Sequence, residues 1–260
     1  MNILQSHGIN QQTVKKSVEI GAENESISFA AGDFDSLLDG TNPFSISFWI
    51  KPADVSDAGN LFSSVNTNSG EFDGIALASR GDASDPNRLR FYLIEDFSGG
   101  FLNPTDFIRR DFIHTMTNGN WYHIVATYDG SEDISGLTVY QNGTSLAADT
   151  AEDNNTGVGT GISTPSNLQF GNGNFLGNAF LGKYTDITIW DIELSSAQVN
   201  TLYNSGTPGN PRTQINDTNL RTWLRVDEDD IFFPTCRDSE GESTVTYVNI
   251  AQTNITTDVP

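Results

Sequence analysis

The chain has 260 residues, which suits one large β domain or two small domains, so length alone leaves the fold open. Thirty-four acidic against thirteen basic side chains give a formal net charge of −21, which disfavours binding to nucleic acid or to an anionic membrane surface. The single cysteine, Cys236, excludes an internal disulfide, and no stretch approaches the roughly 20 apolar residues that membrane insertion requires.

The first strand patterns follow a polar arm. Residues 1–15 contain no acidic side chain and have no apolar period, so we expect them to precede the folded domain. The clearest strand is residues 44–51 (FSISFWIK), because Phe44, Ile46, Phe48 and Ile50 alternate with polar residues. Trp49 falls on the opposite face, where we expect it to pack beneath a loop or a second layer.

Further strand patterns recur along the chain between Gly, Asn, Asp and Pro residues, which is typical of an antiparallel sheet system. They are SVEI and ESISF near the start, IALAS at 75–79, LRFYLI at 89–94, WYHIVATY at 121–128, LTVYQ at 137–141 and YTDITIW at 184–190. Asn142-Gly143 predicts a tight hairpin, since both central positions of a type I′ turn need positive φ. Residues 151–167 lack an apolar period and predict a long loop.

One helix is predicted near residue 200. Ser195 and Gln198 form a capping box, Val199 and Leu202 begin an apolar face, and Gly206 ends the pattern. A Pro/Gly-rich linker follows. We therefore expect an arm at 1–15, a sandwich at 16–206, and a linker with a C-terminal extension at 207–260.

The C-terminal extension contains two strand-like runs, TWLRV at 222–226 and STVTYVNI at 243–250. About 40 residues are too few for a confident independent core, so we expect this segment to pack on the sandwich or on a neighbouring molecule.

The order of four segments resembles a known family. FSISFWIKP, NWYHIVATYDG, LTVYQNGT and FLGKYTDITIWDIELSSAQVNTLYNSG occur in the order found in the laminin-G-like/pentraxin-like branch of the concanavalin-A-like lectin/glucanase superfamily. The resemblance runs from about Lys16 to Gly206. It implies an all-β fold, with two antiparallel sheets stacked as a jelly-roll sandwich and one short helix.

The C-terminal extension resembles, more loosely, the tails that follow laminin-G-like domains in structural proteins of marine-type bacteriophages. Its Trp223 strand, Pro-Thr turn, Asp-containing loop and terminal Asp-Val-Pro carry this resemblance. Thr222-Trp223 stands where two aromatics are common in those tails.

Catalysis is disfavoured by the residues themselves. Retaining glycosidases of this fold resemble one another in an E-x-D-x-x-E strand that holds two carboxylates about 5–5.5 Å apart. The nearest match, residues 71–76 (EFDGIA), has Glu71 and Asp73 but lacks the second glutamate. His7, His114 and His123 have no metal-ligand spacing, and Cys236 has no C-x-x-C partner, so zinc is not expected. We predict no catalytic residues.

Two kinds of binding residue are predicted. The resemblance suggests calcium at the sandwich rim, with Asp33, Asp35 and Asp73 as candidate ligands, although Asp and Asn are also ordinary turn residues. For a glycan, the candidates are Phe175 and Trp223 as aromatic platforms and Asn172 and Asn174 as amide partners, although large aromatics more often belong to cores. No other cofactor is implied.

The leading hypothesis is a non-catalytic structural protein of a virion surface, either a capsid decoration or a tail- or fibre-associated adhesion module. Its partners would be capsid or tail proteins and a cell-surface glycan. The arm and the extension suggest assembly into a homo-oligomer, with a trimer favoured. The alternative is an extracellular or cell-surface carbohydrate-binding or adhesion protein of a bacterium, and a glycan hydrolase is the third possibility.

Overall fold

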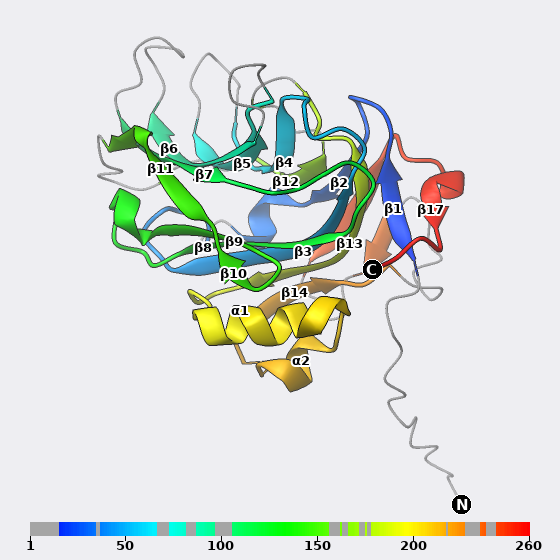
Figure 1. Ribbon diagram of the computed structural model, residues 1–260. Coiled ribbons are helices and arrows are strands. Elements are labelled where there is room, and N and C mark those ends of the chain that lie inside the picture. Colours follow the sequence, from blue (N-terminus) through cyan, green and yellow to red (C-terminus); the bar gives the residue numbers. More distant parts are fainter. Residues whose placement is uncertain are drawn as a thin grey trace, which may run out of the picture.

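The fold was analysed in a computed structural model of the 260-residue chain (Figure 1). It describes residues 16–34, 37–66, 73–81, 87–96, 106–155, 162, 166–171, 175, 178–216, 218–226, 235–237 and 243–260. The predicted arm, residues 1–15, lies outside these ranges. No helix within them is long and apolar enough to cross a membrane.

Two antiparallel sheets stack face to face, as the resemblance implies. Sheet A has the strand order β10-β9-β8-β3-β13-β1-β17, and β14 also pairs with β13. Its strands are β1 (Ser17–Ile20), β3 (Phe44–Pro52), β8 (Tyr122–Tyr128), β9 (Leu137–Gln141), β10 (Thr144–Ser145), β13 (Gly182–Trp190), β14 (Leu220–Leu224) and β17 (Ile255–Thr256).

Sheet B has the order β11-β7-β6-β5-β4-β12-β2-β16-β15. Its strands are β2 (Ser26–Phe29), β4 (Gly59–Ser63), β5 (Gly74–Ser79), β6 (Arg88–Asp96), β7 (Asp106–Ile113), β11 (Ala147–Asn155), β12 (Leu168–Gly171), β15 (Thr235–Arg237) and β16 (Thr244–Val248).

The main core lies between the sheets. The alternating side chains of β3 enter it as predicted, and the ring of Phe48 contacts Phe62 of β4 and Phe170 of β12 at centroid distances of 6.2 and 5.4 Å. These rings meet edge to face, a geometry that favours close packing of aromatic side chains. The inward-facing residues of both sheets therefore form one continuous apolar layer.

Helix α1 (Ser196–Tyr203) covers the outer face of sheet A (Figure 1). Ser195 and Gln198 form the predicted capping box. Trp49, which points away from the main core, is 2% exposed and stacks against Tyr203 at 5.9 Å. The predicted second layer above Trp49 is thus this helix, and Trp190 is buried in an outer cluster with Val199 and Leu202 of the same helix.

The hairpin prediction is confirmed at Asn142-Gly143, where φ is 53° and 80° and β9 turns into β10. A side chain at Gly143 would also approach Asn200 of α1, because its Cβ would lie 2.9 Å from the Asn200 Oδ1 atom. This turn therefore needs glycine both for its backbone angle and for its contact with the helix.

The two strand-like runs of the C-terminal extension both find partners in the sandwich. β14 pairs with β13 in sheet A, and β16 pairs with β2 in sheet B. β17 then returns to sheet A and pairs with β1. Within the described residues, the extension thus packs on its own sandwich and adds strands to both sheets.

Two predicted irregular segments are partly regular. Residues 151–155, predicted as loop, belong to β11, where Asn154 and Asn155 pair with β7. This is a polar strand with no apolar alternation, so only its pairing reveals it. The linker contains helix α2 (Pro211–Gln214), which Asn210 caps and which begins with proline at its first turn.

Candidate functional site

Charged side chains gather on the outer face of sheet B, over β6 and β7. Leu89, Phe91 and Leu93 of β6 face the core, so the alternation of the strand turns Arg88, Arg90 and Tyr92 outward. The same argument turns Arg109 and Asp111 of β7 outward, because Ile108 and Phe112 face the core. We call these five outward-facing residues the arginine face.

Asp111 is the centre of the arginine face. Its carboxylate is fully buried and accepts three hydrogen bonds of 3.0 Å from the Nε and Nη2 atoms of Arg90, its cross-strand partner. Arg88 and Arg109 each bring a guanidinium nitrogen to 3.8 Å from the same carboxylate. Arg88 also forms an ion pair of 2.6 Å with Asp149 of β11. The three guanidinium groups are thus held in fixed positions.

An apolar cluster adjoins the arginine face. Tyr92 packs edge to face against Phe175 with ring centroids 5.0 Å apart, and both belong to a cluster with Phe107. Burial raises the pKa of Tyr92, and the positive charge of Arg90 opposes that rise. Phe175 has no exposed surface, so it supports the neighbouring face and is not itself the exposed platform that we predicted.

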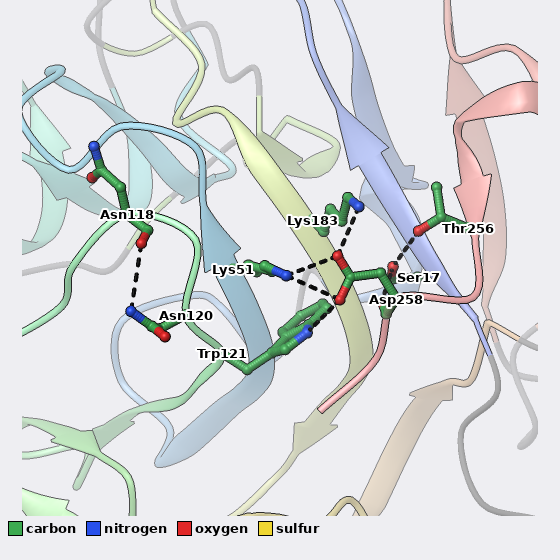
Figure 2. Close-up of polar contacts among 8 residues, drawn as sticks. All are labelled: Ser17, Lys51, Asn118, Asn120, Trp121, Lys183, Thr256 and Asp258. Carbon is green, nitrogen blue, oxygen red and sulfur yellow. Dashed lines mark hydrogen bonds and ion pairs between the residues drawn. The ribbon is translucent and has the colours of Figure 1, made fainter.

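A second polar site lies on sheet A and holds Asp258 (Figure 2). Its carboxylate accepts hydrogen bonds from the Nζ atoms of Lys51 and Lys183 at 2.8 Å and from the indole nitrogen of Trp121 at 3.1 Å. Lys183 and Lys51, as hydrogen-bond donors, hold the pKa of Asp258 well below its ordinary value. We call the three donors Lys51, Trp121 and Lys183 the clasp.

Trp223 lies on β14, where it is 3% exposed. Its indole nitrogen donates a hydrogen bond of 2.6 Å to Asp186, and the guanidinium of Arg225 lies 4.7 Å from the centre of its ring. These contacts bury the ring against its own strand pair, so Trp223 is a packing residue and not an exposed glycan platform.

The predicted calcium ligands are not brought together within the described residues. The Asp33 carboxylate accepts a hydrogen bond from the backbone of Thr244, and Asp73 is 6% exposed beside β5. No group of three or more His, Cys, Asp or Glu side chains there could hold a metal ion. Asp35, Asn172 and Asn174 lie outside the described residues.

The described histidines occupy structural positions. His123 is 2% exposed and shares a hydrogen bond of 2.8 Å with Ser47 on the adjacent strand. Burial lowers its pKa to about 3 and that of His114 to about 4, so both rings are neutral at neutral pH.

Both polar sites escaped the sequence prediction. β7 was not predicted as a strand, so the pairing of Arg90 with Asp111 was hidden. A signal did exist, because Arg88-x-Arg90 and Arg109-x-Asp111 place charges at the two-residue spacing of one strand face. Asp258 had no such signal, since its partners are distant in sequence.

Comparison with solved structures agrees with this architecture. A putative carbohydrate binding protein from Bacteroides ovatus is similar over 96% of this chain, with 18% identity and a TM-score of 0.61, and the chain spans 62% of that protein. The CBM40 of a Ruminococcus gnavus IT-sialidase, solved with α2,3-sialyllactose, is similar over 74% of this chain and 100% of its own, with 14% identity and a TM-score of 0.50.

A Trypanosoma rangeli sialidase is similar over 75% of this chain but only 28% of its own, with 13% identity and a TM-score of 0.51. At these identities the likenesses concern the fold alone. Among curated proteins, no sequence matches the chain.

A family model covers most of the sandwich. The model, of laminin-G type, matches residues 17–200, from the first residue of β1 into α1. The match and the two stacked antiparallel sheets agree, and the chain belongs to the concanavalin A-like lectin/glucanases superfamily.

Proposed function

We propose that the protein is a non-catalytic carbohydrate-binding module and that the arginine face is its binding surface. The observation that carries the proposal is the set of three guanidinium groups held around the buried carboxylate of Asp111. Guanidinium groups donate several hydrogen bonds in fixed directions, which suits the hydroxyl and carboxylate oxygens of a sugar. The similarity to a putative carbohydrate binding protein supports the same class of ligand.

Charge also supports this choice of surface. The chain carries a net charge of −21, yet this face gathers Arg88, Arg90 and Arg109, which form ion pairs with Asp111 and Asp149. Their side chains keep 14–20% of their surface exposed, enough for a ligand to reach. The apolar cluster next to them is buried and supports the arginine face through Tyr92, which is 5% exposed.

A glycan array followed by calorimetry tests the proposal. Arg109→Gln should weaken binding about tenfold or more, since a hydrogen bond to a charged group contributes about 1.5–3 kcal/mol. Arg109 is the variant of choice because its side chain is 20% exposed, the most of the three arginines, and lies farther from Asp111 than Arg90 does. Arg221→Gln is the matched control, because Arg221 is 45% exposed and pairs with Asp191 beside sheet A. Equal affinities for both variants would contradict the site.

We propose further that the module has no hydrolase activity. The segment 71–76 lacks the second glutamate of a carboxylate pair, and the chain spans only 28% of the sialidase that it resembles. Incubation with β-glucans, galactans, alginates and sialylated glycans should release no new reducing ends or free sugars. Steady turnover that disappears on changing Glu71 or Asp73 would contradict this.

We propose a virion surface as the place where the module works, as a capsid decoration or a tail- or fibre-associated adhesion module. The support is the resemblance of the extension to the segments that follow laminin-G-like domains in structural proteins of bacteriophages, including the Asp-Val-Pro segment whose aspartate the clasp holds. Mass spectrometry of purified virions tests this location. If the protein is absent from purified virions and binds a glycan saturably, the alternative function, a carbohydrate-binding or adhesion protein of a bacterium, is favoured.

A further inference from the structure

The outer edge of β1 is covered by a segment that arrives from sheet B. We call residues 249–260 the strap. Ile255 and Thr256 of the strap pair with Val18 and Ser17, and the side-chain amide of Asn254 donates a hydrogen bond of 3.0 Å to the carbonyl of Glu19. The exposed backbone groups of an edge strand are a template for pairing with another chain. The strap therefore occupies the position that a pairing partner would take.

The clasp fixes the far end of the strap. Two residues after β17, Asp258 binds Lys51, Lys183 and Trp121, and its backbone carbonyl accepts a hydrogen bond of 2.6 Å from the Ser17 hydroxyl (Figure 2). The two lysines come from β3 and β13, which lie inside the sheet and do not depend on the strap for their position. The β1 edge and the clasp together therefore fit an extended segment whose acidic residue lies two positions after the residues that pair with β1.

Polar contacts and backbone pairing hold the strap, and Ile255, which is partly buried, also packs against the core. Every residue from Ala251 to Pro260, all of them described, is intermediate or exposed, whereas Ile250 at its root is 4% exposed and belongs to the core. Asn249 has a φ of 55°, a left-handed angle where the chain leaves β16. With its root in place, the strap can leave its site by giving up these polar contacts and the packing of one partly buried apolar residue, Ile255.

We propose that the β1 edge and the clasp form a docking site for an extended segment that carries one aspartate, and that the partner is the strap of a second copy of this chain. The second copy fits because its strap would make the same contacts in trans that are made here within one molecule. Each copy carries one strap and one site. Reciprocal exchange closes a dimer, and cyclic exchange closes a ring such as a trimer.

Engineered cysteines test the exchange on the full chain. In a Cys236→Ser background, one preparation carries Ser17→Cys and another Thr256→Cys, because the Oγ atoms of this register pair are 3.0 Å apart. The two are mixed, warmed to just below the melting midpoint and oxidised. We expect a covalent heterodimer of twice the 28.3 kDa chain mass. Adding Asp258→Asn to the Thr256→Cys chain should lower its yield several-fold.

Two controls make each outcome decisive. Ser131→Cys, an exposed site far along the chain, replaces Thr256→Cys in a mixture that should give only background dimer. The double variant Ser17→Cys/Thr256→Cys should form an internal disulfide. If that bond forms but the mixed chains give only background dimer, the strap is a permanent part of its own molecule and the proposal of exchange is wrong. If neither bond forms, the docking site itself is wrong.

Discussion

Asp186 offers a sharp test of the outer face of sheet A. It lies in β13 at an irregularity in the pairing with β3, has a φ of 50°, is 8% exposed and accepts a hydrogen bond from Trp223. Burial raises its pKa from the ordinary 3.8 to about 7, although the Trp223 hydrogen bond and the charge of Arg225 oppose the rise. Asp186→Asn removes the charge, keeps an acceptor for the indole and tolerates the left-handed backbone.

The direction of the effect follows from proton binding. Between about pH 4 and 7 the folded chain holds a proton on Asp186 that the unfolded chain has lost, so wild-type stability falls as pH rises through this window. A pKa difference of about three units corresponds to about 4 kcal/mol. The Asn side chain at position 186 accepts a weaker hydrogen bond from Trp223 because it is uncharged, and it buries its own N–H donors. We take the resulting loss of stability as about 1 kcal/mol at every pH. We expect Asp186→Asn to stabilise the fold by about 3 kcal/mol at pH 8 and to destabilise it by about 1 kcal/mol at pH 4.

Urea unfolding at several pH values measures this difference directly, and the melting temperature at pH 8 should rise by about 5–10 °C. Asp57→Asn is the matched control, because it removes the same charge from an exposed position. Stability curves of Asp186→Asn and wild type that run parallel from pH 4 to 8 would refute the raised pKa. A variant that is less stable at pH 8 would show that the ionised carboxylate contributes to the fold.

Three further predictions concern the sandwich and its strap. Trp49→Ala and Trp190→Ala should each lower the free energy of unfolding by about 3–5 kcal/mol, because both rings are buried, and unchanged melts would contradict their placement. Asp258→Asn should lower the melting temperature by a few degrees at neutral pH, and this difference should fade in 1 M salt or as pH falls below about 4, since the depressed pKa of Asp258 contributes stability only while the carboxylate is charged. If calcium binds at the rim, a chelator should lower the melting temperature and calcium restore it, whereas identical melts would leave Asp33 and Asp73 as turn residues.

The strands with strict alternation were predictable from sequence, because their inward residues are apolar and their turns carry Gly or Asn. β3 and the hairpin at Asn142-Gly143 are the clearest cases. β7 escaped because Arg109, Arg110 and Asp111 interrupt its apolar residues. Arg110 faces inward at the sheet margin, where it donates a hydrogen bond of 3.0 Å to the carbonyl of Leu137. Because an arginine occupies an inward position of this strand, the alternation of apolar and polar residues that predicts a strand is broken there.

The candidate sites were less predictable than the fold. The aromatics chosen as glycan platforms, Phe175 and Trp223, are buried, because large rings stabilise packing wherever a cluster can accept them. The arginine face depends on register, and the clasp depends on contacts such as that between Lys51 and Asp258, 207 residues apart. Local spacing carries no information about contacts of this range.

The interleaving of the first and last strands has a consequence for how the molecule is made. β2 cannot pair with β16, nor β1 with β17, until residues 244–256 have left the ribosome, and Ser17 and Asp258 are separated by 241 positions. Closing so long a loop is slow compared with forming the hairpins between them. During synthesis there is therefore an interval in which β1 and β2 each have one edge without its final partner strand. Emergence of the strap, residues 249–260, ends this interval.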